Sequence, residues 1–540
     1  MGDGLDSETK DTSFGATTSR PMFAAFCLLI VVNSVISTFV ILADRVPPTH
    51  DVLFMSRAAM MLARAALGEP GMWSGFLDAT HDLFYPPLTH FTALPFSVLY
   101  PDTFDAAALS ISLYSAILMM SVFAIGQRLR DEATGLLAAT LATLSPAALG
   151  FSRVYLVDWP LAALVSATLA MAFATDRFSS RKFSIALGAL CGLGLLVKQT
   201  FVIYAAPAVL VYVTAAIARA KGSHERSRRL AHVGLAALAC VALAGWWYAP
   251  RAFAMITKQE TINALARALE PDRADLLDFL RLALSGAGWI VAPLAVIGLA
   301  LVPRDRHGAA LAAALVVPFA LLPLVLVIMT PRYVLPLVPV AAVLAAYALG
   351  RAPRAVRTTA IVFAVVGALA QAGVVTLARP AGPIDDTEIH ARFQEYGLLR
   401  PQFVGPAPDA LADAIREHRA DGHVVLLLDR PVTQMTQSRL FERNPLFRVE
   451  NLFERASMGI LPPDRDEGAE LGALFDEAGL VLVAFEGDQD DEQTARAVSI
   501  PPSYTSLVFT HWRARESAFA PAEIVADGAL RLVVMKRIAR

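Results

Sequence analysis

The chain has 540 residues, of which 56% are hydrophobic and only 17% charged, and its mean hydropathy is +0.53. This composition excludes an ordinary soluble enzyme and indicates a polytopic membrane protein. The net charge of −2 does not suggest nucleic acid as a partner. Cys27, Cys191 and Cys240 all lie in apolar runs, without CxxC or metal-ligand spacing, which argues against disulfides and structural zinc.

The first predicted element is a polar N-terminus, residues 1–21, which we expect in the cytoplasm. The apolar run that follows is too long for a signal peptide, so we interpret it as a retained span. A bilayer core of about 30 Å needs roughly 20 apolar residues in a helix, which predicts about eleven spans. They lie at 22–43, 106–127, 133–150, 160–176, 184–201, 202–218, 231–249, 286–303, 309–329, 333–349 and 357–378. No clear polar loop separates the two that meet near Thr200, so these are either one span or two.

The first long connector, residues 44–105, contains no span of its own. The stretch THDVLFMSRAAMMLARAALG places Asp51 at a helix N-terminus and Gly68 at its end, with an apolar face at helical spacing between them. The stretch YPPLTHFTALPFSVLYP is aromatic and bounded by proline, and we expect it to lie in the membrane interface. The connector therefore predicts interfacial helices on one membrane face.

Orientation follows from the loops that are rich in arginine and lysine, namely QRLRDE, DRFSSRKF, ARAKGSHERSRRLAH, PRDRHG and GRAPRAVRT. The positive-inside rule places these loops in the cytoplasm. The outer face then holds residues 44–105, residues 151–159, the region around Lys198, residues 250–285 and the sequence MTPRY at 329–333. With an odd number of spans, residues 379–540 also lie outside.

Charge rises from residue 379 onward, and two helix–glycine–strand patterns follow one another. They are PDALADAIREHRADGHVVLLLDRP and EGAELGALFDEAGLVLVAFEG. Residues 379–540 therefore predict a small α/β extramembrane domain, with neither a Gly-rich phosphate loop nor a nucleophile elbow. The predicted fold is mainly α, with residues 22–378 as the transmembrane part.

Several polar residues lie at the ends of apolar runs on the predicted outer face. They are His50, Asp51, His81, Asp82, Arg153, Asp158, Lys198 and Arg332. Carboxylates beside cations suit a substrate that is part lipid and part phosphate, because a carboxylate can act as a base while cations hold a phosphate leaving group. Simpler interpretations exist for five of these residues taken alone. Asp51 and Asp158 can be helix caps, and Arg153, Lys198 and Arg332 can be side chains that reach to the interface.

Five short motifs occur in a recognisable order: an outer-loop aspartate after the first span, YPPL, SRxxLxDxPL, GLGLLVK and PRYVLPLVP. In this order they resemble the GT-C superfamily of membrane glycosyltransferases over roughly residues 22–350. The branch most similar contains the aminoarabinose lipid A transferases and the protein O-mannosyltransferase-like enzymes, including rhizobial galacturonosyltransferases. The resemblance implies an inverting enzyme that takes a sugar from a polyprenyl phosphate, generally without a nucleotide sugar. It also implies a bacterial inner membrane, with the site and the C-terminal domain on the periplasmic side.

Carried over residue by residue, the resemblance implies that Asp51 and Asp158 are catalytic, with Asp51 as the principal base. It implies that the following residues bind the substrate or its lipid phosphate: His50, Tyr85, Arg153, Lys198, Arg332 and Tyr333. His50 departs from the pattern, because many relatives have two acidic residues in a row there, so an acidic metal-binding pair is not predicted. A divalent metal is compatible with the pattern but not required, and no cofactor is assigned. Asp158 either orients the acceptor or holds a cation such as Arg153.

The partners implied are a polyprenyl-phosphate sugar donor, membrane lipids, and an acceptor that is a lipid, a glycan or a protein. A transporter or lipid flippase is the alternative, and an inactive scaffold that presents the C-terminal domain is a third. Transporters place ionisable residues near the midplane and often contain inverted repeats. Here the charges gather at span ends on one side and no repeat is evident, which favours the transferase.

Overall fold

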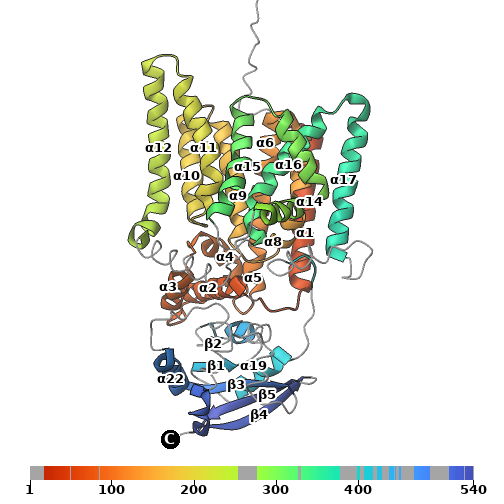
Figure 1. The fold of residues 1–540 in the computed structure, drawn as a ribbon. Coiled ribbons are helices and arrows are strands. Elements are labelled where there is room, and N and C mark those ends of the chain that lie inside the picture. The colour runs from red at the N-terminus through yellow and green to blue at the C-terminus, as the bar shows by residue number, and fades with distance from the viewer. Residues whose placement is uncertain are drawn as a thin grey trace, which may run out of the picture.

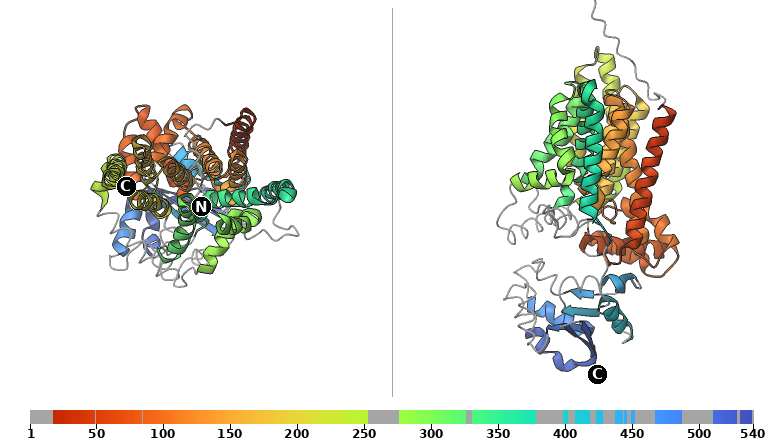
Figure 2. Two further views of the ribbon diagram at one scale, coloured as in Figure 1. Left: turned by 90° about the horizontal axis from the view of Figure 1, so that it is seen from above. Right: turned by 90° about the vertical axis from the view of Figure 1, so that its right-hand side faces the viewer.

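The structure is a computed structural model. It describes residues 18–48, 50–83, 85–252, 276–325, 330–377, 398–401, 407–417, 423–427, 437–442, 444–445, 449–451, 467–486, 510–527 and 530–538. Three layers follow one another along its long axis: a helix bundle, a layer with the short helices α2 and α3, and a β-sheet (Figures 1 and 2). We call the end of the bundle that carries α2 and α3 the site end, and the opposite end the far end. The N-terminus of α1 lies at the far end, and the sheet lies beyond the site end.

The bundle runs from α1 to α17. Its helices are α1 (Arg20–Ala43), α5 (Asp105–Leu109), α6 (Ile111–Leu129), α7 (Glu132–Thr143), α8 (Pro146–Phe151), α9 (Asp158–Ala174), α10 (Arg181–Leu195), α11 (Phe201–Ala218), α12 (Ser223–Tyr248), α14 (Leu276–Leu301), α15 (Arg306–Val325), α16 (Val338–Arg351) and α17 (Arg354–Leu377). The 3₁₀ segment η1 (Ala249–Arg251) extends α12. A second 3₁₀ segment, η2 (Pro331–Leu337), precedes α16. The segment formed by η2 and α16 is the most buried of the long apolar helices, which makes it the centre of the bundle.

Within the described residues, eight helices are long and apolar enough to cross a membrane. This confirms the predicted polytopic helical fold, but it does not confirm the count of about eleven spans. The other three predicted spans correspond to shorter helices: α9 with 17 residues, α10 with 15, and the pair α7 and α8, which are separated by Leu144 and Ser145. The two runs that meet near Thr200 are separate helices, because α10 ends at Leu195 and α11 begins at Phe201.

One long helix is broken inside the bundle. Gly288 in α14 has φ +87°, and a Cβ at this position would lie 2.5 Å from the Gln371 side chain of α17. Gln371 accepts a hydrogen bond from the backbone N–H of Trp289 at 3.2 Å, so a side chain from α17 satisfies a backbone donor freed by the break. The predicted span 286–303 begins close to this break.

The connector between α1 and α6 folds as predicted into short helices at the site end. These are α2 (His50–Ala66), α3 (Met72–Leu83) and α4 (Leu88–Leu99). Asp51 lies in the first turn of α2, and Gly68, with φ +89°, follows its end. Ala58, Met61 and Leu62 of α2 form one hydrophobic cluster with Met72 and Phe76 of α3, so the two helices brace one another.

The C-terminal part contains the predicted small sheet. Its strands are β1 (His423–Leu427), β2 (Val449–Asn451), β3 (Ala478–Glu486), β4 (Phe519–Asp527) and β5 (Leu530–Arg537), in the order β2-β1-β3-β5-β4. The strand β1 pairs in parallel with β2 and β3, whereas β5 pairs antiparallel with β3 and β4. The helices α19 (Ala407–Glu417) and α22 (Glu467–Glu477) precede β1 and β3, which confirms the two helix–strand patterns, and η3 (Glu516–Ala518) precedes β4.

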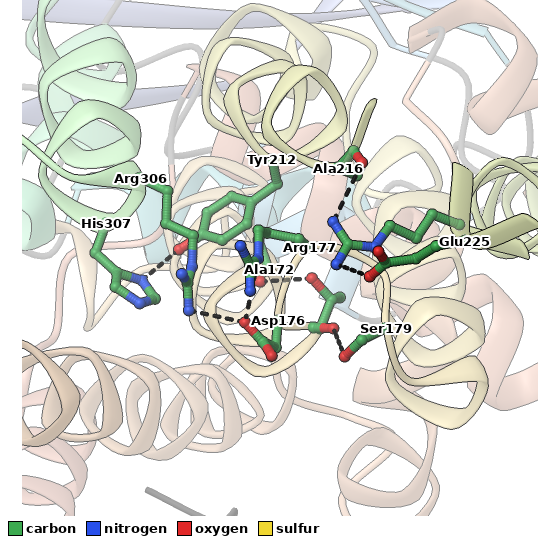
Figure 3. A network of polar contacts seen from close by, with 11 residues as sticks. Ala172, Asp176, Arg177, Ser179, Tyr212, Ala216, Glu225, Arg306 and His307 are labelled. Atoms are coloured by element: carbon green, nitrogen blue, oxygen red, sulfur yellow. Dashed lines mark hydrogen bonds and ion pairs between the residues drawn. The ribbon is translucent and has the colours of Figure 1, made fainter. Parts of the chain in front are cut away.

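At the far end, polar side chains join the loops of four helices (Figure 3). Arg306 at the start of α15 donates to Asp176 at 2.8 Å, and Tyr212 of α11 hydrogen-bonds His307 at 2.6 Å. Arg229 of α12 donates to the carbonyl oxygen of Ala216 at 3.2 Å. This network ties together the connections that the sequence analysis assigned to the cytoplasm.

Candidate active site

The N-terminus of α2 brings Asp51 beside Arg332. The Asp51 carboxylate forms an ion pair with the Arg332 guanidinium and accepts a hydrogen bond from the Tyr85 hydroxyl at 3.3 Å. A negative side chain is favoured in the first turn of a helix, where the backbone N–H groups create a positive end. Arg332 belongs to η2, and its Nε also donates to the Thr330 hydroxyl at 3.2 Å. Segments distant in sequence therefore share one charged contact.

A second ion pair joins α9 to the break between α10 and α11. Lys198 Nζ donates to Asp158 Oδ1 at 2.7 Å, and the two side chains are 6% and 1% exposed. The other carboxylate oxygen of Asp158, Oδ2, is buried and has no hydrogen-bond partner. Since a buried acceptor without a donor is costly, this oxygen is suited to a donor supplied by a bound molecule.

Tyrosines link the two pairs into one cluster. The Lys198 ammonium lies 5.8 Å from the ring centre of Tyr85 and 5.3 Å from that of Tyr333, which are favourable cation–π distances. Tyr204 donates from its hydroxyl to the backbone carbonyl of Tyr333 at 2.8 Å and so fixes η2 against α11. Tyr204 is not among the residues that the sequence predicted for this site. No motif marks it, and its only signal is its place one turn into the helix that follows Lys198.

The charges around Asp51 shift the pKa of two groups. Burial raises the pKa of Asp51, but the charge and hydrogen bond of Arg332, helped by Lys198 and Tyr85, outweigh burial and hold this pKa below its usual 3.8. Burial and the negative charge of Asp51 raise the pKa of Tyr85 well above its usual 10. At neutral pH Asp51 is therefore a carboxylate and Tyr85 a hydrogen-bond donor.

Arg153 lies outside this cluster. Its Nη1 donates to the carbonyl oxygens of Leu399 at 2.8 Å and Leu398 at 3.5 Å, and the residue is 5% exposed. Asp158 does hold a cation, which was one of the two alternatives, but this cation is Lys198, and the suggestion of Arg153 is wrong. The reason is that Arg153 follows the end of α8 while Asp158 begins α9, so each meets a different neighbour. Arg153 anchors the chain that leads toward the C-terminal sheet.

The helix-cap interpretation of Asp158 is also wrong. The N-cap position of α9 is Val157, no side chain caps this helix, and Asp158 lies within its first turn. The side chains of three other candidates, His50, His81 and Asp82, lie outside the described residues. Across the parts of the chain that are described, no group of three or more His, Cys, Asp or Glu side chains is arranged to hold a metal ion.

Residues 85–248 match the family described as dolichyl-phosphate-mannose-protein mannosyltransferase. No curated protein sequence matches this one.

The solved structures that resemble the chain include ArnT from Cupriavidus metallidurans in the apo state, with a TM-score of 0.59 and 14% identity. The same protein bound to undecaprenyl phosphate has a TM-score of 0.57 and 16% identity, and both comparisons cover 95% of this chain and 98% of that one. The arabinofuranosyltransferase AftD from Mycobacteria has a TM-score of 0.51 and 14% identity, over 95% of this chain and 41% of that one. The chain therefore has the fold of ArnT and AftD, in agreement with the resemblance of its five motifs to the GT-C superfamily.

Proposed function

We propose that the chain is an inverting glycosyltransferase that moves a sugar from a polyprenyl-phosphate donor to a hydroxyl group of a lipid, glycan or protein acceptor. The observation that carries this proposal is the cluster of two carboxylate–cation pairs, the partly buried pair of Asp51 with Arg332 and the buried pair of Asp158 with Lys198. The ArnT structure with undecaprenyl phosphate supports the kind of donor, because the two folds correspond over nearly the whole length of both chains.

The cations Lys198 and Arg332 hold the donor phosphate. A guanidinium carries five N–H donors, so Arg332 can bind a phosphate oxygen while other donors stay on protein acceptors. When the bond between the anomeric carbon and the phosphate oxygen breaks, its electron pair remains on the phosphate. The charge that develops there is stabilised by cations already in place.

Asp51 acts as the base. The acceptor oxygen attacks the anomeric carbon from the face opposite the phosphate, and its proton passes to the Asp51 carboxylate. The products are the glycoside with inverted configuration, the polyprenyl phosphate and protonated Asp51. No covalent bond between sugar and enzyme forms in this sequence.

Donor binding also makes Asp51 a better base. In the resting site Arg332 depresses the pKa of Asp51, whereas burial alone raises it. A phosphate that draws Arg332 toward itself weakens the first effect and leaves the second, so the pKa of Asp51 rises toward the range in which a base works well. Asp51 is therefore ionised in the resting site, and its carboxylate becomes a stronger base when the donor binds.

Asp158 has a different role. Its Oδ1 fixes Lys198, while its unpartnered Oδ2 accepts a hydrogen bond from a hydroxyl group of the sugar or the acceptor.

We place the site end on the periplasmic side of a bacterial inner membrane. The arginines of the network in Figure 3, among them Arg177 and Arg306, lie at the far end, as the positive-inside rule requires for a cytoplasmic face.

The full-length protein, reconstituted in vesicles with a labelled polyprenyl-phosphate sugar, tests the function. Label that appears on an acceptor supports a transferase. Label that crosses the bilayer unchanged supports the alternative of a transporter or flippase and overturns the proposal, as does the absence of both.

A further inference from the structure

We propose that the C-terminal domain positions α2, and with it Asp51, through a short docking segment. The docking segment consists of residues 437–442 and 444–445, which lie between β1 and β2. The proposal rests on the proposed function only for the role of Asp51 as base. The contacts that carry it stand on their own.

One face of α2 meets the docking segment. Arg57 donates from Nε to the carbonyl oxygen of Pro445 at 2.6 Å, and its guanidinium carbon lies 4.1 Å from the ring centre of Phe441. Two turns further on, Arg64 donates from Nη2 to the carbonyl oxygen of Glu442 at 2.8 Å. Two arginines of α2 therefore hold backbone oxygens of another domain.

Apolar packing lies between these polar contacts. Leu53 and Met60 of α2 form a buried cluster with Phe104 and Phe441. Leu53, Arg57, Met60 and Arg64 follow one another at intervals of four, three and four residues, which is the spacing of a single helix face. That face as a whole is covered, so the docking segment fixes how α2 is rotated about its axis.

Asp51 lies on the other side of the same helix. Leu53 follows Asp51 by two positions, which is a rotation of about 200° at roughly 100° per residue. The docking segment therefore packs against the face of α2 that is opposite Asp51, while Asp51 faces Arg332. A rotation of the helix by even a part of a turn moves the carboxylate away from its partner.

The docking segment also holds the chain that leads into α2. Ser438 is fully buried and donates from its hydroxyl to the carbonyl oxygen of Pro48 at 2.9 Å. Arg439 donates from Nη2 to the carbonyl oxygen of Arg45 at 3.4 Å. Contacts along the helix and contacts before its first residue restrict both rotation and sliding, and together they set the place of Asp51.

The test compares two single substitutions in the full-length protein. Phe441→Ala removes the ring beneath Arg57, whereas Arg515→Ala breaks an ion pair with Asp476 that lies within the C-terminal domain and does not touch α2. A displacement of about 1 Å at a reacting group can cost roughly 10²-fold in rate. We expect Phe441→Ala to lower kcat by about 10- to 100-fold with little change in KM for the donor, and Phe441→Tyr to restore most of kcat.

A second readout does not depend on activity. Hydrogen exchange of the backbone amides of α2 is expected to accelerate in Phe441→Ala and to stay unchanged in Arg515→Ala. Ser438→Ala, which removes only one hydroxyl, gives a smaller acceleration in the same amides. These results support the proposal that the C-terminal domain positions α2, even if Asp51→Asn proves fully active. In that case only the role of Asp51 as base fails.

Two results overturn the proposal. One is unchanged α2 exchange and unchanged kcat in a folded Phe441→Ala protein. The other is an equal loss of kcat in Phe441→Ala and Arg515→Ala, because it shows that any disturbance of the C-terminal domain has the same effect.

Discussion

Lys198 and Asp158 form a buried ion pair across 2.7 Å, although 40 positions separate them in the chain. Asp158 begins α9, and Lys198 lies in the short break after α10, so the pair locks the site ends of neighbouring helices together. Both side chains are almost completely buried. Each charge is therefore tolerated only because the other is present.

Removing one partner leaves the other charged and buried. We expect Lys198→Met to destabilise the protein by about 3–5 kcal/mol, whereas the double variant Lys198→Met with Asp158→Asn recovers a large part of this loss. Thermal unfolding in detergent measures both. Strictly additive effects of the two substitutions are incompatible with the pairing.

Asp51→Asn keeps the shape of the side chain but cannot take a proton. We expect transfer to fall by about 10²–10⁴-fold, equivalent to roughly 3–5 kcal/mol of transition-state stabilisation, with the fold retained. Initial rates with a labelled lipid-phosphate sugar measure the loss. Asp476→Asn, in the C-terminal domain, is the control and is expected to behave as the wild type. Normal transfer by a well-folded Asp51→Asn protein removes Asp51 from the mechanism.

The pH dependence should report the contact between Asp51 and Arg332. Because the folded pKa of Asp51 lies below 3.8, its ionised form contributes stability above its usual pKa, and this contribution is lost as the pH falls through the lower folded value. The acid limb of kcat/KM that belongs to Asp51 is therefore expected below pH 3.8.

Arg332→Gln should move that acid limb upward, because only Lys198 and the Tyr85 hydrogen bond then oppose the effect of burial on the pKa of Asp51. The readout is the midpoint of the limb rather than the overall rate, which also falls when a phosphate ligand is lost. A midpoint that stays in place contradicts the assigned origin of the shift.

The contact between α10 and α12 depends on the small size of Gly188. A Cβ added there would lie 2.0 Å from the carbonyl oxygen of Ala236. We expect Gly188→Ala to destabilise the protein by about 1–3 kcal/mol, because the backbones must separate. Gly234→Ala in α12 is the matched control: a Cβ there meets nothing within 4 Å, and helix propensity favours alanine by up to about 1 kcal/mol. Thermal unfolding of both variants decides the matter, and equal effects would show that Gly188 is not a close contact.

Much of the fold could be predicted because it depends on local patterns. The apolar runs follow from length and hydropathy, and the bounds of α2 follow from Asp51 at one end and Gly68 at the other. The sequence also indicated which charges lie at span ends. It could not assign their partners, because Arg153 and Lys198 are equally good cations for Asp158 and only the packing of α9 against α10 and α11 selects between them.

Tyr204 and the docking segment illustrate a second limit. Tyr204 acts through its hydroxyl on a backbone carbonyl, and such a contact leaves no trace in residue pattern. Likewise, Arg57 looks like any interfacial arginine until Phe441, which is 384 positions further along, is packed against it. Long-range contacts of this kind depend on tertiary packing rather than on local sequence.

The strand order β2-β1-β3-β5-β4 has a consequence for biosynthesis. The strand β5 is the last in the described chain, yet it lies between β3 and β4, so β4 has no hydrogen-bonded neighbour until β5 has left the ribosome. Domains generally fold as units during synthesis, with the N-terminal parts first. The bundle, α2 and the docking segment are therefore synthesised well before the sheet can be completed. A ribosome that stalls before Leu530 should therefore leave a protein whose bundle, α2 and docking segment are already made but whose sheet lacks β5.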